Sequence, residues 1–116
     1  MIYTYLIPEI PPSNNKFLGR ENRWEYQKIK KHWAQMISLM CVPKPPKPIQ
    51  KAVVLLVYHF PDNRRRDPDN YSGKMILDGL VKSGIIVDDC FSCIDLQLRA
   101  VYDKGGYVKI TIEEVK

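Results

Sequence analysis

The sequence predicts a single α/β domain of the α+β kind, with a mixed β-sheet of about five strands, two main helices and a C-terminal β-hairpin. The chain has 116 residues, 45% of them hydrophobic, which is enough to bury one core without disulfide bonds. Segments that read as strands alternate with two segments whose apolar residues recur at helical spacing. Residues 1–116 are therefore expected to form one domain.

The first half of the chain predicts two strands and one helix. Residues 1–7 alternate and are rich in aromatic and branched side chains, which indicates a strand, and a loop of prolines and asparagines follows. Residues 21–41 place apolar side chains at helical spacing, with glutamates near the start and lysines later. Residues 51–60 are an almost continuous apolar run, which is typical of a strand buried on both faces, so this should be the central strand.

The second half predicts a helix followed by shorter elements. A helix over about residues 72–83 should end before Gly84, which is a plausible C-terminal cap. Residues 84–89 indicate a short strand that leads into two aspartates. Residues 94–103 and 107–115 alternate on either side of a Lys-Gly-Gly turn, which predicts an antiparallel hairpin.

Composition excludes several classes of function. No segment approaches the roughly 20 apolar residues of a membrane span, and the N-terminus lacks a signal peptide's basic start, so a cytoplasmic protein without a membrane partner is expected. Cys41, Cys90 and Cys93 are odd in number and lack the spacing of a zinc site, which favours reduced thiols. No glycine-rich phosphate loop is present, so no nucleotide cofactor is expected.

The charge distribution favours a partner that carries phosphates. Residues 1–50 contain 8 Lys and Arg against 3 Asp and Glu, whereas residues 51–116 contain 10 of each. The surplus of positive charge therefore lies in the first half, beside a half with clustered aspartates. A basic surface suits a polyanion, and the acidic cluster would need a cation in order to approach one.

A charged stretch follows directly after the expected central strand. Three arginines, 64–66, precede Asp67 and Asp69, which flank Pro68. Proline holds the residue before it in an extended conformation, so Asp67 and Asp69 are able to point the same way. Paired carboxylates repel each other unless a cation lies between them, and Mg²⁺ prefers oxygen ligands of this kind. A third ligand is expected from Asp88 or Asp89.

A purely structural interpretation of the same residues is also open. Aspartate before proline is a good helix N-cap, and Asn70 is an ordinary turn residue. The complete set of charges favours phosphoryl transfer instead. A metal activates water, Lys74 would stabilise charge at the phosphorus or the leaving oxygen, and arginines would hold the phosphate backbone.

Taken together, the motifs resemble the RusA family of Holliday-junction resolvases, which are small phage-associated endodeoxyribonucleases. The motifs are PPSNN (11–15), RRRDPDN (64–70), Lys74, LDGLVKSGII (77–86) and the aspartate pair 88–89. The resemblance implies a homodimer that binds four-way DNA junctions and makes paired, Mg²⁺-dependent nicks in DNA recombination and repair, with Mn²⁺ as a substitute. It also implies a set of catalytic residues: Asp67, Asp69, Lys74 and Asp89, with Asp88 as a neighbouring or alternative metal ligand.

The position of the lysine departs from the family pattern. In the family the lysine follows the second aspartate by four residues, whereas Lys74 follows Asp69 by five. On a regular helix a five-residue step turns the two side chains about 140° apart. We therefore predict an irregular backbone between Asn70 and Lys74, which Gly73 would permit. A regular helix with the ammonium facing away would remove Lys74 from the catalytic set.

Other contacts and two rival functions remain open. Arg64, Arg65 and Arg66 are expected to bind DNA, together with a second group: Asn14, Asn15 and Lys16. His59 is expected to be a hydrogen-bonded structural residue. The rivals are a nucleic-acid-binding module without catalysis, and a metal-dependent nuclease that acts on flaps or RNA.

Overall fold

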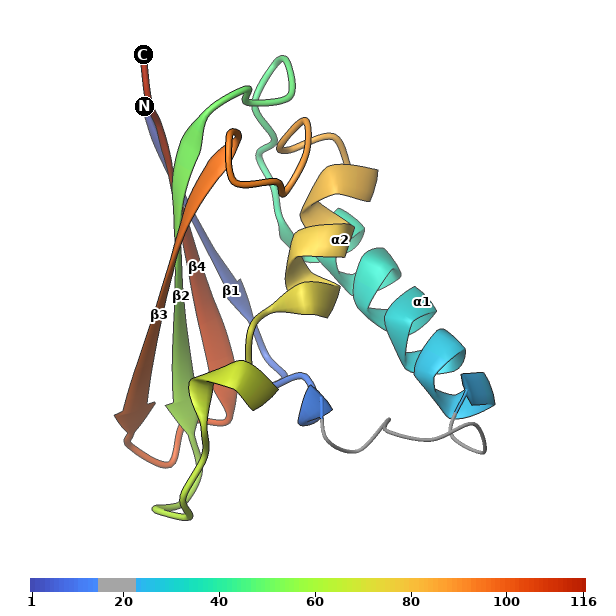
Figure 1. Ribbon diagram of the computed structural model, residues 1–116, viewed down its shortest axis with the longest axis vertical. Helices are drawn as coiled ribbons and strands as arrows, with labels where there is room; N and C mark the ends of the chain where they lie inside the picture. The colour runs from blue at the N-terminus through green and yellow to red at the C-terminus, as the bar shows by residue number, and fades with distance from the viewer. Residues whose placement is uncertain (15–22) are drawn as a thin grey trace.

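The computed structural model describes residues 1–14 and 23–116, which form a mixed four-stranded sheet with two helices on one face (Figure 1). The mixed α/β class is therefore confirmed. The elements in chain order are β1 (Ile2–Ile7), α1 (Arg23–Met40), β2 (Ala52–Phe60), the 3₁₀ helix η3 (Pro68–Asn70), α2 (Lys74–Lys82), β3 (Ile94–Tyr102) and β4 (Tyr107–Glu114). Within the described residues, neither helix has the length and apolar composition that would let it cross a membrane.

The sheet contains four named strands rather than about five. Their order is β1-β4-β2-β3, in which β4 runs antiparallel to β1 and β2, while β3 runs parallel to β2. The short strand predicted over residues 84–89 is wrong, because this segment forms only one isolated bridge, between Ile86 and Ile49. The partner segment is rich in prolines, including Pro48, and proline has no backbone N–H with which to extend a ladder.

The predicted C-terminal hairpin is also wrong. β3 and β4 follow each other in sequence, but β2 lies between them and pairs with both. The connecting turn crosses the end of β2, where Lys104 N and Gly106 N donate to the backbone oxygens of Phe60 and His59 at 3.2 and 2.7 Å. Alternation thus predicted both strands correctly, but it carries no information about which strand pairs with which.

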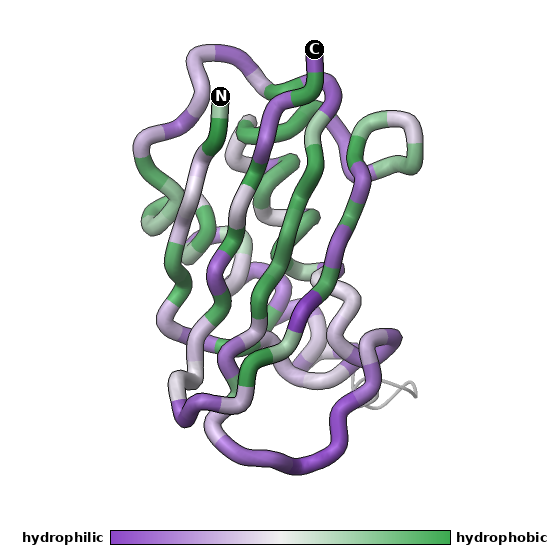
Figure 2. Tube along the Cα trace, turned by 90° about the vertical axis from the view of Figure 1, so that its left-hand side faces the viewer, coloured by the Kyte–Doolittle hydropathy of each residue, from purple (hydrophilic) through white to green (hydrophobic). Residues whose placement is uncertain are grey.

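The central position of β2 is confirmed, whereas its burial on both faces is not. Every second residue of β2 is buried, from Ala52 to Phe60, and the residues between them are only partly buried. Both helices cover the same face (Figure 1), and the other face of the sheet carries no helix formed by residues 1–14 or 23–116 (Figure 2). A strand in a sheet covered on one side needs full burial on that side only.

The two helices approach each other closely above the covered face. Trp33 and Ile37 of α1 are buried, and Gly79 of α2 lies against Ile37. A Cβ atom at Gly79 would come within 2.9 Å of Ile37 Cγ1, so glycine permits this approach. At its C-terminus α2 ends as predicted, because Gly84 has φ +78° and Ile85 N donates to Leu80 O at 3.0 Å. The core therefore lies between the helix pair and one face of the sheet.

Candidate functional site

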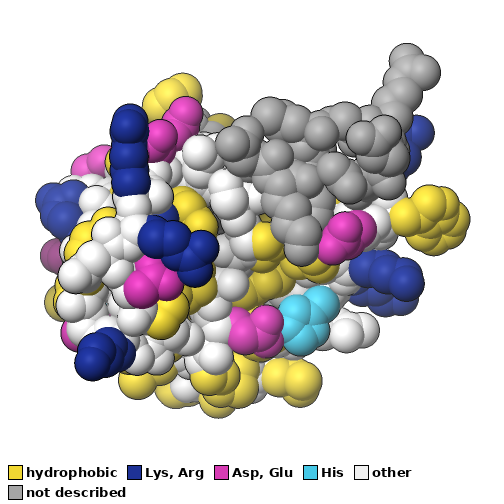
Figure 3. All heavy atoms as spheres, turned by 90° about the horizontal axis from the view of Figure 1, so that it is seen from below, with side chains coloured by type: hydrophobic (Ala, Val, Ile, Leu, Met, Phe, Trp, Pro, Cys, Tyr) yellow, Lys and Arg dark blue, Asp and Glu magenta, His cyan; other side chains and the backbone are white. Residues whose placement is uncertain are grey.

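The charged stretch leaves the sheet at the end of β2 and leads through η3 into α2 (Figure 1). Seen from this end of the molecule, Lys and Arg side chains are interspersed with Asp and Glu side chains on the left-hand part of the face (Figure 3). Open sheets commonly carry their sites at strand ends of this kind. The geometry of the stretch is set by three separate groups of contacts.

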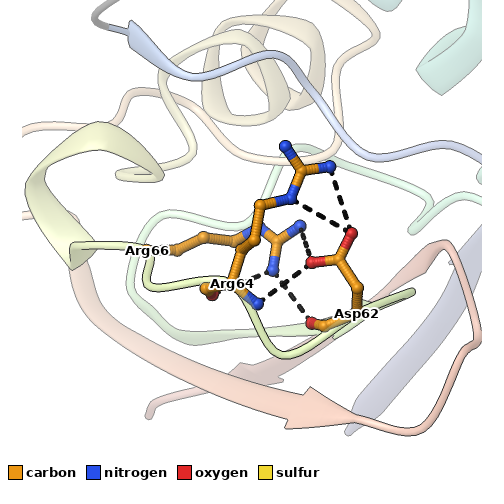
Figure 4. Close-up of polar contacts among 3 residues, drawn as sticks. All are labelled: Asp62, Arg64 and Arg66. Carbon is orange, nitrogen blue, oxygen red and sulfur yellow. Dashed lines mark hydrogen bonds and ion pairs between the residues drawn. The ribbon is translucent and has the colours of Figure 1, made fainter.

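The first group of contacts ties Arg66 and Arg64 to Asp62 (Figure 4). Arg66 donates from Nη2 to Asp62 Oδ1 at 2.9 Å and from Nη1 to Asp62 O at 3.0 Å. Its guanidinium lies 4.3 Å from the centre of the Phe60 ring, and only 13% of its side chain is exposed. The Arg66 side chain therefore holds the loop together by contacts within the protein. It was expected to face DNA instead.

Asp62 organises this loop by its hydrogen bonds, and the sequence interpretation missed it. Its carboxylate accepts hydrogen bonds from the backbone N–H of Arg64 at 3.1 Å and from the side chains of Arg64 and Arg66. The bonds from Arg64 and Arg66 lower the pKa of Asp62 to about 2. The available signal was its spacing, because arginines stand two and four residues later. In contrast, the side chains of Arg64 and Arg65 are 82% and 89% exposed.

The second group of contacts concerns Asp67. Its backbone is extended, with φ −100° and ψ 138°, as predicted from the proline that follows it. Asp67 stands at the N-cap of η3, but its side chain makes no capping hydrogen bond. The carboxylate is instead 49% exposed and accepts a bond from Arg65 Nε at 3.3 Å. The structural interpretation of Asp67 as a capping residue therefore lacks its defining contact.

The third group of contacts holds the backbone at Asp69. Asn14 donates from Nδ2 to the backbone oxygen of Asp69 and to Ser72 Oγ, both at 3.1 Å. The PPSNN segment thus reaches the turn between η3 and α2, and Asn14 positions this turn. Asn15 and Lys16, which were also expected to bind DNA, lie outside the described residues.

The predicted irregular backbone before Lys74 is confirmed. η3 ends at Asn70, Gly73 has φ +81°, and α2 begins at Lys74. A Cβ atom at Gly73 would overlap Leu56 Cδ1, so both the conformation and the space require glycine. Lys74 also stands at the first position of a helix, where the macrodipole disfavours a cation. Because this position disfavours a lysine for local structural reasons, Lys74 is a candidate for a functional role.

Lys74 does not form the helical ion pair that would give it a merely structural role. Asp78 lies four residues later but instead pairs with Lys30 of α1, at 3.7 Å. Lys74 lines a surface hollow that it shares with Asn14 and residues of α1. The lysine therefore lies close to the same PPSNN residue that holds Asp69.

Asp88 and Asp89 lie in the loop that follows α2. The backbone N–H of Asp89 donates to Asp88 Oδ1 at 2.8 Å. Partial burial raises the pKa of Asp89, and the neighbouring carboxylates of Asp88 and Asp78 raise it further. Because neighbouring negative charges destabilise the ionised form of Asp89, a cation bound nearby would stabilise that form.

The two acidic pairs do not meet within one chain. The loop with Asp88 and Asp89 follows Ile86, which bridges to Ile49 just before β2, whereas Asp67 and Asp69 come after the end of β2. A strand of nine residues, such as β2, spans about 30 Å. Figure 1 shows the two segments near opposite ends of α2. Accordingly, residues 1–14 and 23–116 contain no group of three or more His, Cys, Asp or Glu side chains that could hold one metal ion.

A small pocket of about 80 Å³ opens beside Asp67. Its lining includes the aromatic side chains of Tyr58, Phe60 and Tyr71, together with Arg66 and Arg99. The Tyr58 and Phe60 rings stack on each other, and Tyr71 packs edge-to-face against both. Tyr58 Oη is buried and has no hydrogen-bond partner among the described residues, and burial raises the Tyr58 pKa. The pocket next to Asp67 therefore combines aromatic and cationic side chains.

His59 has the structural role that was predicted. Its Nδ1 lies 2.8 Å from Asp103 Oδ2, and its ring stacks on Tyr107 at 4.1 Å. The hydrogen bond with His59 lowers the pKa of Asp103. These contacts hold the β3–β4 turn across the end of β2.

Comparison with known proteins decides the family. No protein-family model matches the chain. The crossover junction endodeoxyribonuclease RusA of Escherichia coli strain K12 is 33% identical over 113 residues, which cover 90% of this chain and 89% of that protein. The chain belongs to the RusA family.

Other RusA proteins support this assignment. The RusA crossover junction endodeoxyribonuclease of Enterobacteria phage 82 is 32% identical over 114 residues, with 90% of this chain and 89% of that protein covered. RusA of Shigella sonnei strain Ss046 is 40% identical over 58 residues, about half of each chain. The resemblance inferred from the motifs is confirmed, and the phage relative agrees with the expected phage association.

For this RusA-family chain, the structure separates the predicted site residues into three sets. Asp67, Asp69 and Lys74 lie along one short segment at the end of β2, with Arg64 and Arg65 exposed beside them. Asp88 and Asp89 lie in a second segment at the other end of α2. Arg66 and Asn14 hold backbone in place by hydrogen bonds within the protein.

Proposed function

We propose that this RusA-family chain is a divalent-metal-dependent endodeoxyribonuclease that resolves four-way DNA junctions by paired nicks, in recombination and repair. The name that its relatives share, crossover junction endodeoxyribonuclease, supports the reaction and the junction substrate. The observation that carries the proposal is Asp67, which stands at a cap position without capping and leaves its carboxylate half exposed. We also propose that residues 1–116 act as one endonuclease domain.

The proposed cofactor is Mg²⁺, with Mn²⁺ as a substitute. Asp67, Asp69, Asp88 and Asp89 offer only carboxylate oxygens, which are the ligands that hard divalent cations prefer. These carboxylate ligands suit Mg²⁺, but the described residues of a single chain do not bring three such ligands together. A bound cation would supply an acidified water and would offset negative charge at the phosphorus.

We propose that a homodimer brings the two acidic pairs together. Since the pairs lie at opposite ends of α2, the Asp67–Asp69 segment of one protomer would face the Asp88–Asp89 pair of the partner subunit. A two-fold axis would generate two such composite sites from two chains, and isologous dimers are the commonest oligomers. Two equivalent sites also suit paired nicks in a nearly symmetric junction.

The remaining residues would act on the DNA backbone. Arg64 and Arg65 are exposed and able to bind phosphates, and Asn15 and Lys16 remain candidates for backbone contacts. Lys74, at the start of α2, would stabilise negative charge on the phosphate under attack. Binding should therefore weaken steeply as the salt concentration rises.

The nicking of a synthetic four-way junction tests the function. We expect Asp69→Asn to lose at least about 100-fold in Mg²⁺-dependent nicking while it keeps its thermal unfolding midpoint and its junction binding. Asp95→Asn is the matched control, because Asp95 is an exposed aspartate on β3 that belongs to neither acidic pair. Equal nicking by wild type and Asp69→Asn would contradict the proposal.

Mixed dimers test the composite site. Asp69→Asn and Asp89→Asn chains, each inactive alone, are co-expressed with different affinity tags, and the mixed dimer is isolated. If each site draws on two chains, one of its two sites contains only wild-type aspartates, and nicking at about half the wild-type level per dimer returns. A mixed dimer with no activity would show that the aspartates of one site come from one chain.

A second candidate is a branched-DNA-binding module without catalysis. The separation of the two acidic pairs within one chain favours it, because no ligand group is formed among the described residues. Such a module would bind the junction but would not nick it at any concentration of Mg²⁺ or Mn²⁺. Parallel assays with flap, duplex, single-stranded and RNA substrates at one salt concentration would identify a nuclease of different substrate preference.

A further inference from the structure

Two free thiols lie in contact immediately after the Asp88–Asp89 pair. The Sγ atoms of Cys90 and Cys93 are 3.2 Å apart, and Cys90 Sγ also lies 3.2 Å from Ser92 Oγ. The sequence favoured reduced thiols at these positions, and the folded chain places the two sulfur atoms side by side.

The backbone between the two cysteines has the geometry that a disulfide bond requires. Cys93 N donates to Cys90 O at 3.0 Å, which closes a turn over residues 90–93. The Cα atoms across such a turn are less than about 7 Å apart, and disulfides join Cα atoms about 4.4–6.8 Å apart. Rotation of the two side chains is therefore enough to shorten the Sγ–Sγ distance to a bond.

This pair is accessible to a reagent in solution, whereas the third cysteine is not. Cys90 and its neighbour Phe91 are exposed and Cys93 is partly exposed, while Cys41 is fully buried in the core. A metal site is a poorer explanation for the paired thiols. A structural zinc site needs four ligands, and no third ligand joins the two thiols among the described residues.

We propose that Cys90 and Cys93 form a reversible disulfide by exchange with a low-molecular-weight disulfide such as oxidised glutathione. One thiolate attacks a sulfur of the reagent and releases one glutathione thiol, which leaves a mixed disulfide on the protein. The second thiolate then attacks the protein sulfur and releases the second glutathione. The protein loses two electrons and two protons, and the reagent is reduced to two thiols.

The disulfide would constrain the turn that directly follows the acidic pair. Cys93 N and Ile94 N both donate to Cys90 O, so a covalent ring would reinforce the connection from Asp89 to the start of β3. The importance of this constraint for nicking rests on the proposed function, since Asp88 and Asp89 are the proposed metal ligands. Formation of the bond itself does not depend on any activity.

Mass spectrometry of the whole protein after equilibration with oxidised glutathione tests the bond. We expect wild type to lose the mass of two hydrogen atoms, and reduction by dithiothreitol to reverse this. Cys90→Ser and Cys93→Ser should instead accumulate one glutathione adduct, and Cys41→Ala should behave as wild type. Glutathione adducts or disulfide-linked dimers in wild type, without the internal loss, would overturn the proposal.

Hydrogen exchange tests the constraint separately. In the oxidised protein, the backbone amides of Cys93 and Ile94 should exchange at least several-fold more slowly than in the reduced protein, because the turn opens less often. Unchanged exchange in a protein with the bond formed would overturn the constraint. A protein that fails both tests but nicks junctions would leave the proposed nuclease function intact.

Discussion

Asn14 is hydrogen-bonded to the backbone of Asp69 across 55 residues of sequence, with its Nδ2 3.1 Å from the Asp69 oxygen. The same amide donates to Ser72 Oγ, so one side chain holds both η3 and the segment between η3 and α2. The first loop of the chain therefore controls where an aspartate of the charged stretch is placed. Because the amide is already occupied, its main task is to position the site.

Removal of this amide should reduce nicking more than stability. Asn14→Ala loses the two hydrogen bonds that hold Asp69 and Ser72 in place, so we expect junction nicking to fall about 5- to 10-fold because the site is less well positioned. The thermal unfolding midpoint should change little, since the loop lies at the surface. Asn63→Ala is the control, because Asn63 is exposed in the neighbouring loop. Equal nicking by the two variants would refute the positioning role.

Arg65 and Arg66 should respond in opposite ways to alanine substitution. Arg66→Ala removes buried hydrogen bonds to Asp62 and the contact with Phe60, and should lower the free energy of unfolding by about 1–3 kcal/mol. Arg65→Ala should leave the free energy of unfolding unchanged and weaken junction binding. It should also reduce the salt dependence of the binding constant by about one released counterion. Denaturant titration and binding at several salt concentrations measure both. The interpretation fails if Arg65→Ala is the more destabilised variant.

Alanine substitutions at Gly73 and Gly84 distinguish the cost of backbone strain from the cost of steric overlap. Both have positive φ, at +81° and +78°. A Cβ atom at Gly73 would overlap Leu56, whereas a Cβ atom at Gly84 would have no described neighbour within 4 Å. Gly84→Ala should cost about 1 kcal/mol in unfolding free energy. Gly73→Ala should cost clearly more and should also reduce nicking, because Lys74 follows directly. Equal costs in denaturant titrations would argue against the close approach to Leu56.

The removal of two different tyrosine hydroxyls should have different effects on the stability of the fold. Tyr58 Oη is buried without a partner among the described residues, so Tyr58→Phe should leave stability unchanged or raise it by up to about 1 kcal/mol. Tyr5 Oη donates to Pro43 O at 2.7 Å, so Tyr5→Phe should cost about 1 kcal/mol. Chemical denaturation compares them. A clear loss of stability in Tyr58→Phe would mean that this hydroxyl is satisfied in solution.

The stability of the fold should decrease in acid through Asp62. Its pKa is lowered from 3.8 to about 2 by hydrogen bonds from Arg64 and Arg66, so the folded protein holds its charged form more tightly. A lowered pKa stabilises the fold above the unfolded value, and this contribution is lost as the pH falls from about 4 to about 2. Unfolding titrations across this range should show a shallower pH dependence for Asp62→Asn. Because the pKa of Asp103 is also lowered, by His59, some dependence should remain.

Local features of the chain were predictable because their causes lie close together in sequence. Helix ends at Gly73 and Gly84 follow from glycine's freedom to adopt positive φ. The extended backbone at Asp67 follows from the proline after it. Misjudged features depended on distant partners. The hairpin predicted from β3 and β4, for example, is prevented by β2, which pairs with both strands but comes much earlier in the sequence.

The sequence by itself determined the kinds of element, their approximate bounds, the break before Lys74 and the RusA family. Side-chain periodicity and motif order carry that information, since both are written along the chain. Only the tertiary structure decided that β2 lies between β3 and β4, and that the aspartates at 67 and 69 lie away from those at 88 and 89. Periodicity reports that one face of an element is buried, whereas the choice of neighbour is made by pairing between segments far apart in sequence.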